Sequence, residues 1–185
     1  MAEEVLICVD VETAGPIPAH YAMLSIGACP VMDIGETFYV ELKPDRDQVQ
    51  PEALAISGLV MDDLRRDGMD PKEAMLAFEQ WVKQVVPEGA RPVLVAFNAS
   101  FDWMFIHDYF LRYLGRNPFG HSALDIKAYF MGQSGRQWSE TSMQHISRHF
   151  LDEIRLTHNA LRDAQDQAEI FQKILKLNPR FNISE

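Results

Sequence analysis

The sequence predicts an α/β fold built on a mixed five-stranded sheet, in which three antiparallel strands and further parallel strands are flanked by helices. Two observations predict this fold class. Of the 185 residues, 47% are hydrophobic and 24% are charged, which is typical of one globular domain with a substantial core. Three strand-like segments with short connections come first, followed by a strand, a helix, a strand and helices. That order favours a mixed sheet over a fully parallel one, and we expect residues 1–185 to form a single domain.

The first strand-like segment, residues 4–11, is an apolar and β-branched run that ends in acidic residues. A run of this kind suits a central strand buried on both faces. Residues 23–32 and 36–42 predict two further strands, and the second of these alternates between apolar and polar side chains. Because the connections are short, we expect the three strands to form an antiparallel meander.

The first long helix is predicted over residues 71–86, where apolar residues recur at helical spacing. Asp70 is placed to cap it and Pro71 to occupy its first position. Residues 92–97 then predict a short buried strand, and residues 100–114 a helix, which together imply a crossover unit. The remaining predicted elements are a strand over 123–126 and helices over 140–149 and 158–177.

The charge distribution does not favour extended binding to long nucleic-acid duplexes. The net charge is −10, and residues 1–100 contain 7 basic against 17 acidic side chains. A chain of this kind is not suited to coating long duplexes through lysine and arginine contacts, although metal ions can neutralise carboxylates beside a phosphate locally. No apolar run approaches the roughly 20 residues that cross a bilayer, and the first residues are acidic where a secretory signal is basic. We therefore expect a cytoplasmic protein with no membrane partner.

Asp10 and Glu12 are the first candidates for chemistry. They lie two residues apart at the end of the first strand, so their side chains point to the same side of the sheet. An isolated pair of this kind often caps a loop or meets basic partners. Here the two carboxylates follow a buried strand, where their charge needs a compensating cation. Oxygen ligands alone favour Mg²⁺ or Mn²⁺ over zinc.

Three further residues fall at comparable positions. Asp102 lies in the first turn of the helix that follows the second buried strand, where an acidic residue also serves simply to stabilise the helix dipole. Asp163 lies at the edge of the apolar stripe of the last helix and can reach the first strand. His158 precedes it at the helix start. Together, four carboxylates and one histidine form the set expected for two divalent ions and a general base.

These residues carry a resemblance to a known family. The three segments Asp10-x-Glu12-Thr13-x-Gly15, Asn98-x-x-Phe101-Asp102 and His158-Asn159-Ala160-Leu161-x-Asp163-Ala164 resemble the three motifs of the DEDDh exonucleases. These are the DnaQ-like 3′→5′ exonucleases, which have an RNase H-like fold. The motifs stand in the family's order and cover nearly the whole chain. His158 stands five residues before Asp163, as the family's histidine does before its last aspartate.

The resemblance implies a metal-dependent 3′→5′ exonuclease that trims the 3′ ends of single-stranded DNA or RNA and releases nucleoside 5′-monophosphates. It implies two Mg²⁺ ions, for which Mn²⁺ can substitute, held by Asp10, Glu12, Asp102 and Asp163. Asp10 would bridge both ions, and His158 would take the proton from the attacking water. The residues expected at the substrate are Thr13, Asn98 and Phe101. For Phe101, a role as a core aromatic at the helix start stays open.

The chain also departs from the family pattern. Phe97 stands where many relatives have histidine, Ser25 where many have glutamate, and Ser57 where many have another histidine. None of these changes removes an expected metal ligand, but they leave substrate preference open. Asp125 matches an acidic position common in such folds, and we interpret it as structural support.

Two other functions stay open. One is a catalytically silent nucleic-acid-binding module on the same fold. The other is a two-metal phosphohydrolase of dinucleotides or nucleotides. A zinc site at His145 and His149 has suitable i, i+4 spacing but lacks the glutamate of a metalloprotease motif. The choice between RNA and DNA is also open, and so is a homodimer, although we expect an enzyme that works alone.

Overall fold

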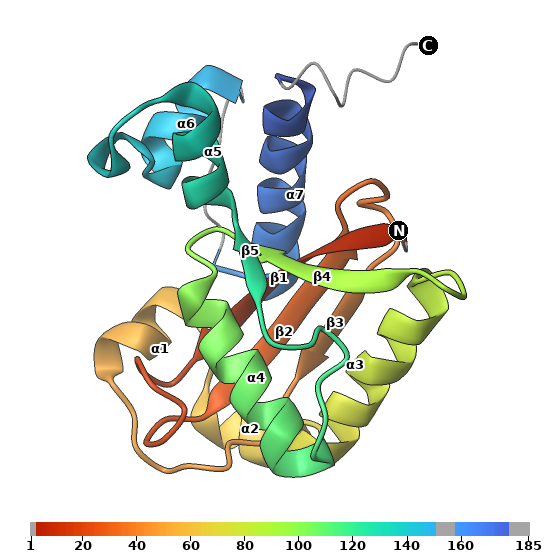
Figure 1. The fold of residues 1–185 in the computed structure, drawn as a ribbon. Helices are drawn as coiled ribbons and strands as arrows, with labels where there is room; N and C mark the ends of the chain where they lie inside the picture. Colours follow the sequence, from red (N-terminus) through yellow and green to blue (C-terminus); the bar gives the residue numbers. More distant parts are fainter. Residues whose placement is uncertain (1–2, 151–157, 178–185) are drawn as a thin grey trace.

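The computed structural model describes residues 3–150 and 158–177, which form a five-stranded sheet in the order β3-β2-β1-β4-β5 (Figure 1). The central strand, β1, pairs antiparallel with β2 and parallel with β4, which confirms the predicted mixed sheet. The five strands are β1 (Glu4–Thr13), β2 (Met23–Pro30), β3 (Phe38–Glu41), β4 (Arg91–Ala96) and β5 (Ala123–Asp125).

Helices cover both faces of the sheet, as predicted (Figure 1). On one face lie α3 (Pro71–Val85) and α4 (Ser100–Leu114), and on the other lies α7 (Ala160–Lys176). Near α7 are α5 (Ile126–Ser134) and α6 (Met143–Phe150), and the short 3-10 helix η1 (Trp138–Glu140) contacts α5. Asp70 caps α3 as predicted, because its carboxylate accepts the N–H groups of Lys72 and Glu73.

The alternation of side chains along β1 sets the two faces apart. Ile7, Val9 and Val11 pack into the core beneath α3 and α4, whereas Cys8 packs into the core beneath α7. Successive strand side chains point to opposite faces, so Asp10 and Glu12 lie on the α7 side together with Cys8. The apolar run therefore presents its two terminal acids to the last helix of the fold.

The start of α7 lies very close to β2. Gly27 of β2 pairs with Asp10 of β1, and a side chain at Gly27 would place its Cβ 2.1 Å from the carbonyl carbon of Ala160. Only a residue without a Cβ permits this approach. The absent side chain thus allows the first turn of α7, with Asp163, to rest beside the end of β1.

Some elements differ from the prediction. Helices α1 (Pro51–Ser57) and α2 (Met61–Asp67) occupy a stretch for which we predicted no element. Each has only 7 residues, too few to establish a helical period, and α1 has no buried residue. The strand predicted over 123–126 ends one residue earlier, because Asp125 caps α5 by accepting the N–H of Ala128. The helix predicted over 140–149 is divided into η1 and α6.

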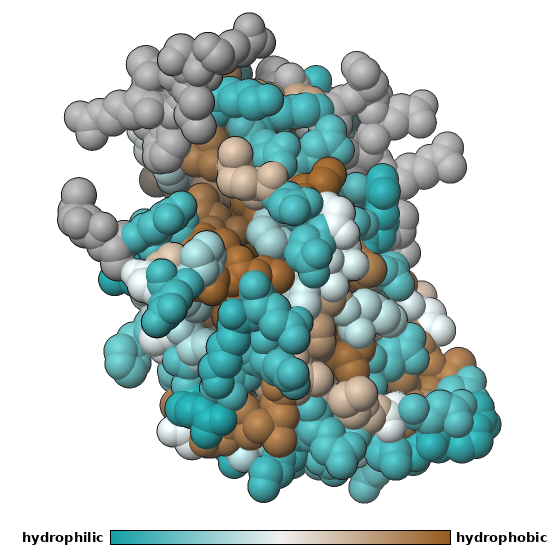
Figure 2. All heavy atoms as spheres, turned by 90° about the vertical axis from the view of Figure 1, so that its right-hand side faces the viewer, coloured by the Kyte–Doolittle hydropathy of each residue, from teal (hydrophilic) through white to brown (hydrophobic). Residues whose placement is uncertain are grey.

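Hydrophilic side chains cover most of the face shown in Figure 2, and hydrophobic ones lie between them in separate groups. None of the helices in residues 3–150 and 158–177 combines the length and the apolar character that a membrane span requires.

Candidate active site

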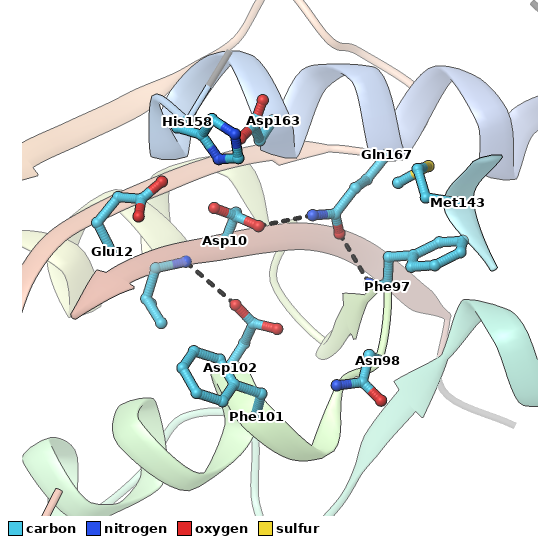
Figure 3. A pocket seen from close by; sticks show the side chains of 11 residues that line it. Asp10, Glu12, Phe97, Asn98, Phe101, Asp102, Met143, His158, Asp163 and Gln167 are labelled. Atoms are coloured by element: carbon cyan, nitrogen blue, oxygen red, sulfur yellow. Dashed lines mark hydrogen bonds between the residues drawn. The ribbon is translucent and has the colours of Figure 1, made fainter. Parts of the chain in front are cut away.

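A pocket of about 270 Å³ lies where β1, the start of α4 and the start of α7 meet (Figure 3). All the predicted site residues except Thr13 line it: Asp10, Glu12, Asn98, Phe101, Asp102, His158 and Asp163. These side chains come from three segments far apart in the sequence. The topology therefore brings the three sequence motifs to one place.

Three carboxylates converge most closely. Asp10, Glu12 and Asp163 each offer an oxygen, and these oxygens all lie within 4.8 Å of one another. Asp163 is held in place by the first turn of α7, whose start Asn159 caps by accepting the N–H of Arg162 at 3.1 Å. Figure 3 shows Asp163 on α7 facing Asp10 and Glu12 on β1. Carboxylates this close require a cation or protons between them.

Asp102 approaches from the other side of β1. Its side chain is 4% exposed, and its Oδ1 accepts the backbone N–H of Val11 at 3.1 Å. Val11 lies between Asp10 and Glu12, so this hydrogen bond ties the first turn of α4 to the acidic end of the strand. Asp102 does not belong to the group of three converging oxygens, although it lines the same pocket.

His158 lies one residue before the residue that caps α7. It is exposed and lines the pocket next to Asp163 (Figure 3). Its φ angle is 52°, and Asn98 has a φ of 67°. In the part of the chain that the structure describes, these are the only residues other than glycine with positive φ, and both line this pocket. Such backbone conformations are costly and are concentrated at functional sites.

Burial and mutual repulsion raise the pKa values of three carboxyl groups in the pocket. Burial, followed by the charges of Asp102, Glu12 and Asp163, raises the pKa of Asp10 well above its usual value. Burial and the charge of Asp163 raise the pKa of Glu12 to about 7. Burial raises the pKa of Asp102 to about 8, with a smaller increase from the charge of Glu12, although the N–H of Val11 opposes the shift. The carboxylates are crowded together and partly removed from water, an arrangement that bound cations would stabilise.

The residues present fit divalent cations. The donors are carboxylate oxygens, which are the ligands that Mg²⁺ and Mn²⁺ prefer. Among the described residues, the pocket lining contains no lysine or arginine that could neutralise the cluster from within. A hard divalent ion is therefore the group best suited to the space between these side chains.

The predicted substrate residues divide into two groups. Asn98 and Phe101 line the pocket on the side of the β4–α4 connection. Thr13 is buried outside the lining, and its hydroxyl donates to the carbonyl of Gly15 at 2.9 Å. Asp125 accepts the N–H of Ala99 at 2.7 Å, which agrees with its interpretation as structural support.

The zinc site considered at His145 and His149 stays a prediction. His145 is exposed on α6, where its Nδ1 lies 2.6 Å from the hydroxyl of Ser142. The side chain of His149 lies outside the described part of the chain.

Sequence reasoning missed several pocket residues, of which Gln167 is the most informative. The others are Val11 and Met143, whereas Phe97, named above as a departure from the family pattern, also lines the pocket. Gln167 stands one helical turn after Asp163, is 4% exposed and donates its amide to Asp10. A polar residue four positions after an acidic candidate, beside the alanine stripe of the last helix, was a signal available in the sequence.

The family model RNase_T, described as Exonuclease, matches residues 7–171 of the chain. A curated protein from Escherichia coli, 3′-5′ DNA exonuclease Cap18, is 46% identical over 178 residues, which cover 96% of this chain and 95% of that protein. Ribonuclease T of Klebsiella pneumoniae is 29% identical over 91% of this chain and 83% of its own length.

Solved structures agree on the fold. The nuclease domain of 3′hExo, a DEDDh family member bound to rAMP, superposes with a TM-score of 0.79 at 16% identity, over 97% of this chain and 96% of that one. Escherichia coli exonuclease I in complex with a dT13 oligonucleotide superposes with a TM-score of 0.73 at 20% identity, and 96% of this chain covers 42% of that larger one.

Proposed function

The chain belongs to the RNase_T exonuclease family and is a 3′→5′ exonuclease of the DEDDh type that acts on nucleic acids, and we propose that it trims single-stranded 3′ ends with two divalent cations. The products are nucleoside 5′-monophosphates. Mg²⁺ is the proposed cofactor, and Mn²⁺ can substitute for it. DNA is the favoured substrate, because the relative with 46% identity over nearly the whole chain is named a DNA exonuclease.

The observation that carries this proposal is the convergence of Asp10, Glu12 and Asp163, whose oxygens lie within 4.8 Å of one another. We assign Asp10 to both cations, and Glu12 and Asp163 to the cation beside the attacking water. Asp102 would support the second cation through the carboxylate oxygen that does not accept the N–H of Val11. Cations held by these residues would activate the attacking water and would stabilise charge on the leaving 3′ oxygen.

His158 is the proposed general base. It lines the pocket beside Asp163, is exposed to solvent and lies one residue before Asn159, the cap of α7. A neutral imidazole there takes a proton from the attacking water and passes it to bulk solvent. Its exposure allows the proton to leave without an internal relay.

The pocket suits one unpaired terminal nucleotide. It is lined by the apolar side chains of Phe97, Phe101 and Met143 beside the carboxylates. We assign Phe101 to stacking against the terminal base, which tolerates any base, and Asn98 to polar contact with the same nucleotide. The acidic surface of the chain and the small pocket both favour contact with an end over contact with a long duplex.

The test is digestion of 5′-labelled single-stranded DNA and RNA of identical sequence in Mg²⁺, with duplex DNA and a dinucleotide as additional substrates. We expect a ladder shortened from the 3′ end, fastest on single-stranded DNA. Digestion of the dinucleotide alone would support the rival phosphohydrolase. Asp163→Asn is expected to abolish the ladder. Asp166→Asn is the matched control, because Asp166 lies on the same helix and pairs with Arg162 outside the pocket lining.

A further inference from the structure

We propose that Gln167 is a positioning residue of the exonuclease site, which fixes one oxygen of Asp10 for cation binding and holds the β4–α4 connection against it. This inference rests on the proposed function, since it concerns the same cations and the same terminal nucleotide. It adds a residue that none of the three sequence motifs contains.

The geometry consists of two short hydrogen bonds from one amide. Nε2 of Gln167 donates to Oδ1 of Asp10 at 2.7 Å, and Oε1 accepts the backbone N–H of Phe97 at 2.8 Å (Figure 3). The thiol of Cys8 also approaches Oε1, at 3.9 Å. Gln167 thereby connects α7, β1 and the end of β4, which together carry most of the pocket.

The orientation of the amide follows from its partners. The group of Phe97 that faces Gln167 is its backbone N–H, which can only donate, and the thiol of Cys8 lies on the same side, so we place the oxygen of Gln167 toward both. The NH₂ group must then face Asp10. With Oδ1 engaged in this way, the other oxygen of Asp10 lies on the side of Glu12 and His158 (Figure 3). Gln167 thus selects which oxygen of Asp10 faces the other carboxylates.

The side chains closest to glutamine in size and chemistry do not reproduce both contacts. Glutamate can accept from Phe97 but cannot donate to Asp10 when ionised, and it would add another negative charge to the cluster. Asparagine is one methylene shorter. An apolar residue of equal length, such as methionine, leaves the N–H of Phe97 without this acceptor and frees Asp10 to rotate.

The contact to Phe97 extends the effect to the substrate. Phe97 precedes Asn98, which has a φ of 67° and lines the pocket, and Phe101 follows in the first turn of α4. The same amide therefore holds both Asp10, which we assign to the cations, and the connection that carries Asn98 and Phe101, which we assign to the nucleotide. This arrangement fixes the two parts of the pocket relative to each other. Supporting residues of this kind contribute about 10–100-fold to metal affinity or activity.

The experiment compares Gln167→Met with Gln165→Met. Gln165 lies on the same helix and donates to the carbonyl of Ile34 at 2.9 Å, away from the pocket. Binding of Mn²⁺ is measured by isothermal titration calorimetry without substrate, and KM and kcat are measured at saturating Mn²⁺. For Gln167→Met we expect the Kd for Mn²⁺ to rise about 10–100-fold and the KM for the oligonucleotide to rise severalfold. Gln165→Met is expected to match the wild type in both.

A Kd for Mn²⁺ within twofold of the wild type in folded Gln167→Met overturns the inference. If that variant does not fold, the side-chain amide signals of Gln165 and Gln167 are followed by NMR in the wild-type protein during Mg²⁺ titration. A shift confined to Gln167 supports the inference, and an unchanged Gln167 signal contradicts it. Digestion by the wild-type protein in the same buffers reports separately on the proposed function.

Discussion

At the scale of single residues, the carboxylates of the site repel one another when they are ionised, and bound cations would reduce this repulsion. Burial and neighbouring carboxylates raise the pKa values of Asp10, Glu12 and Asp102 in the metal-free protein. Each of these charged groups would therefore be more stable in water or beside a cation. We therefore expect these three carboxylates to lower the stability of the protein without cations and to increase its affinity for them.

The substitution Asp10→Asn separates these two effects. Removing one charge relieves repulsion, so the metal-free variant should melt a few degrees higher, which corresponds to about 1 kcal/mol. Activity should fall by about a thousandfold or more, because cation stabilisation of the transition state amounts to several kcal/mol. Thermal melts in EDTA and in Mn²⁺, together with digestion rates, measure both quantities.

The control for this substitution is Asp63→Asn, since Asp63 lies on the exposed surface of α2 and pairs with Arg66. It should leave activity and the melting shift in Mn²⁺ unchanged. The interpretation fails if Asp10→Asn keeps the full shift in Mn²⁺.

His158→Ala tests the proposed general base. A side chain that moves a proton but holds no cation should affect kcat alone, and we expect a decrease of about 10²–10⁴-fold. The Kd for Mn²⁺, measured by calorimetry, should stay at the wild-type value. His145→Ala, at an exposed position on α6, is the control. A variant that loses Mn²⁺ binding along with activity would instead identify His158 as a ligand.

Residue types and spacing were enough to predict the acidic side chains that line the candidate pocket, but not the amide that contacts one of them. Asp10, Glu12, Asp102 and Asp163 were predicted because a strand end or a helix start gives an acidic residue a recognisable context. Gln167 lies inside a helix, and its importance depends on contacts with Asp10 and with Phe97, which stand 157 and 70 positions away in the sequence. Such contacts exist only once the fold is known.

At the scale of elements, the position of α7 depends on the absence of a side chain at Gly27. In Gly27→Ala the new Cβ would overlap the backbone of Ala160, so the start of α7 must move. We expect a loss of about 3 kcal/mol in the free energy of unfolding, at the upper end of the cost of overpacking. Urea denaturation measures it, and digestion should slow because His158 and Asp163 move with the helix.

Gly132→Ala provides the comparison. Gly132 lies on α5, and a Cβ added there would have nothing within 4 Å, so alanine should stabilise the protein by about 0.5–1 kcal/mol. Equal stability of Gly27→Ala and the wild type would contradict the close approach of α7 to β2.

The long elements were predictable and the short ones were not. Helix α4 has the predicted bounds, 100–114, because its apolar face and the following Gly115 mark it clearly. Helices α1 and α2 have two turns each and bury few side chains, so no periodic pattern identifies them. Close packing at Gly27 was likewise beyond the sequence, since it depends on where α7 lies.

At the scale of the whole molecule, the acidic cluster makes stability depend on pH. In the unfolded chain these carboxyls have pKa values near 4, whereas in the folded chain the pKa of Glu12 is about 7 and that of Asp102 about 8. Between these limits the folded state binds more protons, so the free energy of unfolding decreases as pH rises. Below about pH 4 both states are protonated, and these groups no longer make the stability change with pH.

We therefore expect the metal-free protein to lose on the order of 1–3 kcal/mol between pH 5 and pH 8. Mg²⁺ competes with the protons, so its stabilising effect should be larger at pH 8 than at pH 5. Urea denaturation in EDTA and in Mg²⁺ at both values checks this. A stability in EDTA that does not change over this range would show that the carboxylates are not coupled.

Several expectations for the molecule as a whole stay predictions. These are a single domain over residues 1–185, a cytoplasmic location, and a choice between a homodimer and an enzyme that works alone. The location and the assembly depend on surroundings that hydrophobic periodicity and motif spacing do not encode.

The most direct test of the account is anomalous diffraction from crystals of the wild-type protein grown with Mn²⁺ and a short single-stranded oligonucleotide. The account predicts two manganese peaks, about 4 Å apart, with Asp10 between them. Glu12 and Asp163 should contact one ion, and Asp102 should lie beside the other. An absence of manganese at these carboxylates, or a single ion held by other residues, would contradict it.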